Sequence, residues 1–309
     1  MQRSEMEMLS LGTNARESDR LGSKLIFYNM CVHLREISKV FTCKPTHFSD
    51  TRVIDLDIII MWSNMRSFLL LGLSFIPLAV ATNPPSVTTI NSTTWHLSNG
   101  DSFAMTINSK GYAYSMVWEG RELVRNATGG YSDTGGKTTV NFTTGPTVVE
   151  QTKDMIHVAF DSYLATVHYV LFSGLAGHYQ YVINNNLGSQ GEVRSLYRFD
   201  PLQFTWGRTN IKNAPLPSIV DIETGYKVED ETWQRRNGTY VTKYDFSCFV
   251  RDLDFHGLYG NNVGAFVIAP SKDYYIGDHL KQELMLHRES STDDAVLLHM
   301  YHGATILIS

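Results

Sequence analysis

Apolar and polar residues alternate in many short segments after residue 82, which is the pattern of β-strands with one buried face. The alternation is clear at Phe103, Met105 and Ile107, and clusters of turn-forming residues separate the segments. The segments are 103–107, 112–118, 156–160, 167–171, 179–183, 193–199, 238–250 and 264–268. No run of ten or more residues shows a helical period. The pattern predicts an all-β protein, a large β-sandwich in a single domain spanning 82–309.

The segment 65–81 has the three-part layout of a secretory signal peptide. A short basic start at Met65 precedes an apolar run, 68–78, and the small residues Ala79 and Ala81 suit a cleavage site. The run is too short for a comfortable membrane span. We therefore expect a secreted, extracellular protein with no membrane attachment after cleavage, although a buried strand or helix is the alternative for this run.

Residues 1–64 stand before this signal, where a signal would normally come first. They are polar and irregular and show no sustained period. We expect either an unstructured extension or a gene-model artefact, with translation starting at Met65. If the extension belongs to the protein, the apolar run 68–78 would serve as an internal signal-anchor.

Four N-x-[ST] triplets follow the expected cleavage site. Their asparagines are Asn91, Asn126, Asn141 and Asn237. Such triplets arise often by chance, but four behind a signal peptide agree with a secretory route. We therefore expect a glycoprotein.

Charge and aromatic content narrow the range of partners. The formal net charge is −5 and no basic patch is evident, which argues against nucleic-acid binding. Aromatic residues make up 12% of the chain. Most of them should serve the core of strands, but flat rings also cover the apolar faces of sugars.

The run 191–199 carries two arginines that could bind an acidic polymer. On a strand, Arg194, Leu196 and Arg198 share one face, and four residues place the two arginine roots roughly 13 Å apart. A guanidinium binds a carboxylate in a bidentate manner, so the pair could span neighbouring acidic sugars. The simpler reading is two solvent-exposed arginines on a strand.

A second basic candidate, Lys243, lies in the expected strand 240–246. Alternation would put four residues on the opposite face from this lysine. They are Tyr240, Thr242, Tyr244 and Phe246. A lysine in the middle of a strand is usually a solvated residue, so the pattern alone gives it no chemical role.

Familiar catalytic and metal motifs are missing from the sequence. There is no nucleophile elbow, H-E-x-x-H, P-loop or dinucleotide fingerprint, and the three cysteines lack metal-ligand spacing. His256 and His302 are further candidates, but a lone histidine in a β-protein is more often structural. We expect no cofactor and no metal.

The two basic segments, 191–199 and 242–247, resemble the rhamnogalacturonan lyases of polysaccharide lyase family four. The order and spacing of further segments fit the same family. These are 118–123, 130–133, 255–257, 263–270, 280–284 and 301–303. The resemblance runs from about Thr82 to Ala304.

The resemblance implies a galactose-mutarotase-like β-sandwich that cleaves the rhamnose–galacturonate backbone of pectin by β-elimination. Lys243 matches the family's catalytic lysine, and Arg194 and Arg198 match its substrate-binding arginines. Basic side chains, rather than calcium, then neutralise the substrate carboxylate. The implied partner is the pectic polysaccharide rhamnogalacturonan I, bound by a monomer.

The sequence departs from the family pattern near its end. The family's second catalytic residue is a histidine, and Thr305 stands at the matching position, three residues after His302. Threonine cannot relay a proton near neutral pH, so we expect a sandwich that is incomplete at its C-terminus and has little lyase activity. A non-catalytic carbohydrate-binding sandwich and a mutarotase-like epimerase are the alternatives.

Overall fold

A computed structural model describes residues 26–34, 83–134, 139–186, 193–249, 254–268, 282–284 and 286–301. Within these ranges the chain forms four antiparallel β-sheets and one short helix, α2 (Ile219–Thr224). The same ranges contain no helix long and apolar enough to cross a membrane. The predicted all-β sandwich is confirmed.

The first large sheet has nine strands. Their order across the sheet is β14 (Asn213–Pro215), β13 (Trp206–Thr209), β19 (Phe255–Gly260), β20 (Val263–Ile268), β1 (Ile26–Leu34), β11 (Tyr179–Asn184), β10 (Ala165–Phe172), β9 (Met155–Asp161) and β8 (Thr147–Gln151). Every neighbouring pair is antiparallel.

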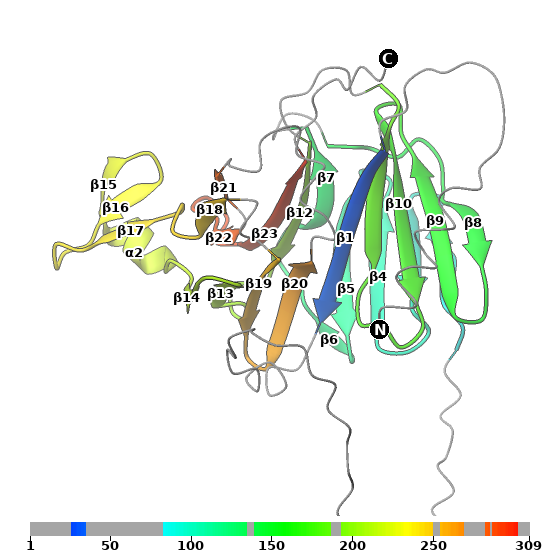
Figure 1. The fold of residues 1–309 in the computed structure, drawn as a ribbon, viewed down its shortest axis with the longest axis horizontal. Coiled ribbons are helices and arrows are strands. Elements are labelled where there is room, and N and C mark those ends of the chain that lie inside the picture. The colour runs from blue at the N-terminus through cyan, green and yellow to red at the C-terminus, as the bar shows by residue number, and fades with distance from the viewer. Residues whose placement is uncertain are drawn as a thin grey trace, which may run out of the picture.

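The second large sheet also has nine strands. Eight of them follow the order β2 (Ser86–Asn91), β3 (Thr94–Ser98), β4 (Phe103–Asn108), β5 (Ala113–Trp118), β7 (Gly129–Asp133), β12 (Val193–Phe199), β23 (Ala295–Tyr301) and β22 (Leu286–Arg288). The ninth, β6 (Arg121–Glu122), pairs with β5. Figure 1 shows the two sheets as the layers of the sandwich.

The core lies between the two large sheets because each strand turns its apolar residues inward. Tyr197 and Phe199 of β12 belong to this core. Trp95 of the second sheet meets Phe160 of the first edge to face, with ring centroids 5.6 Å apart. Such aromatic contacts add to the free energy of burial and fix how the layers face each other.

A small lobe, residues 219–242, projects from one side of the sandwich (Figure 1). It contains α2 and a three-stranded sheet of β15 (Tyr226–Glu229), β16 (Thr232–Gln234) and β17 (Tyr240–Thr242). The lobe has its own apolar cluster of Ile222, Trp233 and Val241. Helix α2 thereby covers one face of the three-stranded sheet.

The expected strand 238–250 is wrong in its middle. The structure has β17, then a turn at 243–246, then β18 (Ser247–Phe249), which pairs with β21 (Gln282–Leu284). The physical reason is the burial of Phe246, only 2% exposed, in the sandwich core. The chain turns here because it passes from the lobe back to the sandwich.

The stretch 1–64, which we expected to be irregular, contains strand β1 in the middle of the first sheet. This strand pairs with β11 on one side and β20 on the other. Its sequence is largely apolar, and this apolar content is the local signal for a strand in this stretch. The expected signal peptide, 65–81, lies outside the described residues.

Candidate functional site

Strand β12 carries the two candidate arginines on the face of the second sheet that points away from the core. Ser195, Tyr197 and Phe199 are buried on the inner side, so Arg194 and Arg198 lie on the outer side. Leu196, between them, packs in a separate apolar cluster with Tyr131 of β7. The alternation predicted for this strand is therefore present.

Arg194 forms a bidentate ion pair with Asp133. The two residues lie directly opposite each other on β12 and β7. Nε of Arg194 is 2.9 Å from one carboxylate oxygen and a terminal nitrogen is 3.0 Å from the other. Both side chains are largely buried. The contact joins the two strands and holds the guanidinium of Arg194 against the carboxylate of Asp133.

Arg198 lies among an aromatic hydroxyl and two carboxylates. Its Nε donates to the hydroxyl of Tyr131 at 3.0 Å, and its Nη1 is 3.5 Å from both Glu289 and Asp294. Asp294 also accepts a hydrogen bond from Thr128 at 3.1 Å. The guanidinium is thus held in place from β7 on one side and from the segment after β22 on the other.

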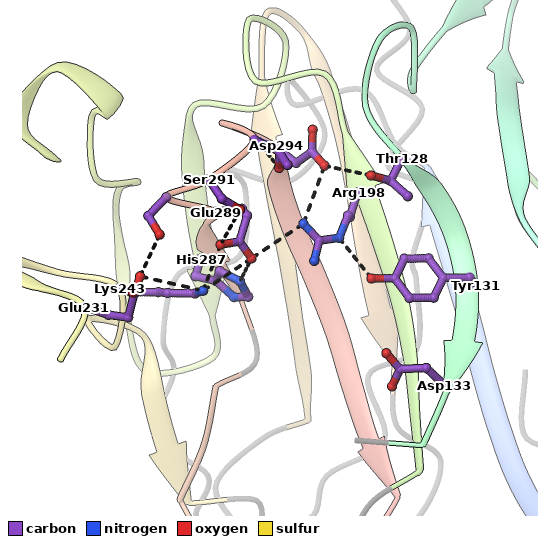
Figure 2. Close-up of polar contacts among 12 residues, drawn as sticks. Thr128, Tyr131, Asp133, Arg198, Glu231, Lys243, His287, Glu289, Ser291 and Asp294 are labelled. Atoms are coloured by element: carbon purple, nitrogen blue, oxygen red, sulfur yellow. Dashed lines mark hydrogen bonds and ion pairs between the residues drawn. The ribbon is translucent and has the colours of Figure 1, made fainter. Parts of the chain in front are cut away.

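Lys243 reaches the same site from the turn that follows β17 (Figure 2). Its ammonium donates to Glu289, with distances of 3.1 and 3.3 Å to the two carboxylate oxygens. Glu231, in the lobe, lies 3.9 Å from the same nitrogen. Glu289 therefore bridges Lys243, at the junction of lobe and sandwich, and Arg198 of the sandwich.

The charges around Glu289 determine its ionisation. His287, whose Nε2 lies 3.8 Å from the carboxylate, and the ammonium of Lys243 hold the pKa of Glu289 well below its usual range. Burial lowers the pKa of His287 to about 4, so this imidazole is neutral near pH 7. Glu289 is thus a carboxylate flanked by the cations of Lys243 and Arg198, with Glu231 and Asp294 beside them.

The alternation in both segments also predicts that Lys243 and Arg194 face one groove on the same sheet, and this prediction is wrong as to the sheet. Lys243 lies outside the second sheet, at the junction of lobe and sandwich, and its contacts lead to Arg198 rather than to Arg194. The reason is the turn at 243–246, which ends the strand before the lysine. The catalytic role of Lys243 and the substrate-binding roles of the arginines remain predictions.

Nothing in the sequence singles out the acidic members of the site. Glu289 and Asp294 lie in the segment after β22, whereas Glu231 lies far upstream in the lobe, and an acidic residue in a turn carries no signal of its own. The one local clue was the run from His287 to Glu289, where a histidine, an arginine and a glutamate stand side by side.

The other sequence candidates are placed as follows. His256 is buried, and its Nε2 donates to the backbone oxygen of Leu298 at 2.7 Å. It thus ties β19 to β23, which is a structural role. His302 and Thr305 lie outside the described residues.

The four candidate glycosylation sites are all exposed. They are Asn91, Asn126, Asn141 and Asn237. In two of them, at hairpin turns, the asparagine oxygen accepts from the threonine hydroxyl of the same triplet, at 3.1 Å for Asn91 and 2.7 Å for Asn237. Glycosylation itself stays a prediction.

Within the described ranges, no group of three or more His, Cys, Asp or Glu side chains could hold a metal ion.

Comparison with known proteins adds sequence relatives to this geometry. A rhamnogalacturonate lyase of Dickeya dadantii is 32% identical over 166 residues. About half of the chain is thus similar in sequence to a rhamnogalacturonate lyase. Rhamnogalacturonate lyase B of Emericella nidulans is 34% identical over 113 residues, and a probable rhamnogalacturonate lyase B of Aspergillus niger is 32% identical over 111. No family model matches the chain.

The matches cover only parts of these proteins. The Dickeya alignment takes in 51% of this chain and 28% of its relative. The Emericella and Aspergillus niger alignments each take in 30% of the chain and 17% and 16% of the relatives. The chain thus matches less than a third of each relative's length.

Proposed function

We propose that the chain is a rhamnogalacturonan endolyase-type domain that acts on the galacturonate-containing backbone of pectin by β-elimination. The observation that carries the proposal is the meeting of Lys243 and Arg198 at Glu289, across the junction of lobe and sandwich. Two cations placed around one carboxylate form a site that would also receive the carboxylate of a galacturonate. The names of the sequence relatives support the same substrate class.

The elimination needs a cation and a base. The C5–H bond and the C4–O bond of galacturonate break, a C4=C5 double bond forms, and the leaving oxygen takes up a proton. Negative charge develops on the adjacent carboxylate, where Arg198 would stabilise it. Lys243 would accept the C5 proton, which it can do only after its ammonium has lost a proton.

Binding of substrate must also displace an internal carboxylate. Glu289 now occupies the space between Lys243 and Arg198. The incoming sugar carboxylate would replace Glu289 on Arg198, and the departure of Glu289 would release Lys243 from its ion pair. In this account, substrate binding itself frees the lysine from its contact with Glu289.

Turnover of rhamnogalacturonan I tests the proposal through the ultraviolet absorbance of the unsaturated uronate product. We expect the purified chain to produce it slowly, because Thr305 stands where the family's second catalytic histidine is expected. We expect Lys243→Ala to lower the rate further, by at least about 100-fold, as loss of a general base does. Lys153→Ala is the matched control, because Lys153 is an exposed lysine in a turn of the first sheet. No product from the unchanged chain, or equal rates for Lys243→Ala and the control, would contradict it.

A second candidate is a non-catalytic carbohydrate-binding sandwich. The observation in its favour is that Arg194, Arg198 and Lys243 each already contact a carboxylate of the protein. A site arranged in this way can bind an acidic polymer by exchanging one carboxylate for another without any chemistry. Retention on rhamnogalacturonan I without any unsaturated product would favour this function.

A further inference from the structure

One face of the three-stranded sheet in the lobe is open, and it carries two tyrosines. The backbone pairing places Tyr226, Gln234 and Tyr240 directly opposite one another on β15, β16 and β17, so their side chains project from the same face. The other face packs Trp233 and Val241 against α2. Among the described residues, no helix therefore covers the tyrosine face.

The two tyrosine rings contribute little to the core of the lobe. Tyr226 is 73% exposed and Tyr240 is 59% exposed. The side chain of Tyr226 has no hydrogen bond or ring contact within the part of the chain that the structure describes, whereas the hydroxyl of Tyr240 accepts one hydrogen bond, from the amide of Gln234 at 3.3 Å. Exposed aromatic rings that the fold does not use are a feature of binding surfaces.

The spacing of the rings suits an extended sugar chain. Two interstrand spacings separate Tyr226 from Tyr240, so their backbones lie roughly 10 Å apart. A flat ring covers the apolar face of a pyranose, and the amide of Gln234 between the rings can hydrogen-bond sugar hydroxyls. The face thus offers two stacking positions with a polar group between them.

The tyrosine face is continuous with the candidate site. Tyr240 stands three residues before Lys243, about 10 Å along an extended chain. Thr232 and Thr242 lie between them on the same face, with their hydroxyls 3.1 Å apart. Glu231, in the turn that joins β15 to β16, lies 3.9 Å from the ammonium of Lys243.

We propose that the face formed by Tyr226, Gln234 and Tyr240 is an additional subsite that binds the polysaccharide chain beyond the Lys243–Arg198 site by stacking on its sugars. This inference rests on the proposed substrate class. It explains why the lobe projects from the sandwich next to the site, and it predicts that affinity grows with polymer length. The occupant is an extended polysaccharide, and its sugars need carry no charge where they meet the rings.

The test compares retention of variants in gels containing rhamnogalacturonan I with their release of unsaturated product. Tyr226→Ala/Tyr240→Ala should weaken retention at least about tenfold, which corresponds to 1.4 kcal/mol. The control is Tyr163→Ala, because Tyr163 is equally exposed, at 73%, in the turn between β9 and β10. Tyr226→Trp/Tyr240→Trp keeps flat rings at both positions and should keep retention.

The outcomes separate this subsite from the proposed activity. Unchanged retention of the double alanine variant, or an equal loss in Tyr163→Ala, overturns the subsite whether or not the protein cleaves the polymer. Absence of retention for the unchanged protein also overturns it. A third contrary result would be self-association of the protein in the absence of polymer that the double alanine variant abolishes, because the face would then bind a second copy. Retention that depends on the tyrosines, without unsaturated product, supports the subsite and contradicts only the lyase activity.

Discussion

At the scale of single residues, burial of histidine side chains gives the protein a titratable interior. His178 and His256 are both buried, and burial lowers the pKa of His178 to about 3 and that of His256 to about 4. In an unfolded chain the same groups have a pKa near 6.5. Because the folded state excludes a proton that the unfolded state binds, acid favours unfolding.

The sign of this effect can be tested at His256. Its contribution is fully present above pH 6.5 and is lost as the pH falls toward 4. His256→Gln keeps an N–H donor for the oxygen of Leu298 but does not titrate. We expect its unfolding free energy to gain about 2 kcal/mol relative to the unchanged protein between pH 7 and pH 5. Urea unfolding at both pH values measures this.

The internal control is the range from pH 7 to pH 8, where neither protein should change its proton uptake at this position. A difference in stability that stays constant down to pH 5 would mean that His256 binds a proton in the folded protein as readily as in the unfolded one.

At the scale of elements, the pair of β7 and β12 depends on the contact between Asp133 and Arg194. Arg194→Ala removes a bidentate ion pair that is mostly shielded from water. The expected loss of unfolding free energy is about 2 kcal/mol, between the values for surface and buried ion pairs. Urea unfolding would show it. Arg236→Ala, at an exposed arginine in the lobe, should leave the midpoint unchanged.

The same variant separates two roles for Arg194. If the arginine were held for substrate alone, as the resemblance implied, Arg194→Ala would weaken polymer binding and leave the unfolding midpoint where it was.

Strand β13 approaches the candidate site so closely that only glycine fits at one position. A Cβ on Gly207 would overlap the side chain of Leu286 and lie 2.8 Å from the ring of Phe246. Gly207→Ala should cost about 1–3 kcal/mol of unfolding free energy, as overpacking does. It should also lower turnover, because Leu286 precedes His287 and Phe246 ends the turn that begins with Lys243.

A second substitution distinguishes overpacking from a general intolerance of alanine. Leu286→Val shortens the side chain that Gly207→Ala would displace, so the double variant should recover part of the lost stability. A double variant that is less stable than both single variants would contradict the steric explanation.

Much of the sheet structure could be read from the alternation of side chains. In β12 the buried Tyr197 and Phe199 and the outward Arg198 follow the predicted period of two. The turn at Lys243 could not be predicted in this way. Phe246 continues the alternation of a strand, but its burial depends on Gly207, which lies far away in sequence. The meeting of Lys243 with Glu289 is set by packing of the lobe on the sandwich, which no local pattern encodes.

At the scale of the whole molecule, the position of β1 bears on the expected processing. We predict that a chain translated from Met65 is secreted and begins at Thr82, as N-terminal sequencing of the secreted protein would show. Residues from upstream of Met65 in that material would contradict it. The secreted form would lack β1, the strand between β11 and β20.

Hydrogen exchange can measure the difference between the two forms. Loss of β1 leaves β11 and β20 with unpaired backbone groups. Their amides should exchange faster in the chain beginning at Thr82 than in the full chain, while those of β4 and β5 in the second sheet should not change. Equal protection in both forms would mean that β1 does not contribute to the sheet.

Under the proposed function, the bridging position of Glu289 makes its carboxylate a competitor of the substrate carboxylate. An acidic sugar reaches Lys243 and Arg198 only in molecules whose Glu289 has moved aside, and its apparent affinity is its intrinsic affinity reduced by that fraction. Dissolved salt weakens the internal pair and the external pair alike. Higher ionic strength therefore weakens the binding of the polymer to the two cations and also weakens the competing ion pair with Glu289. Because these effects oppose each other, the affinity for an acidic polymer should fall less steeply with salt than it would for two cations without an internal partner.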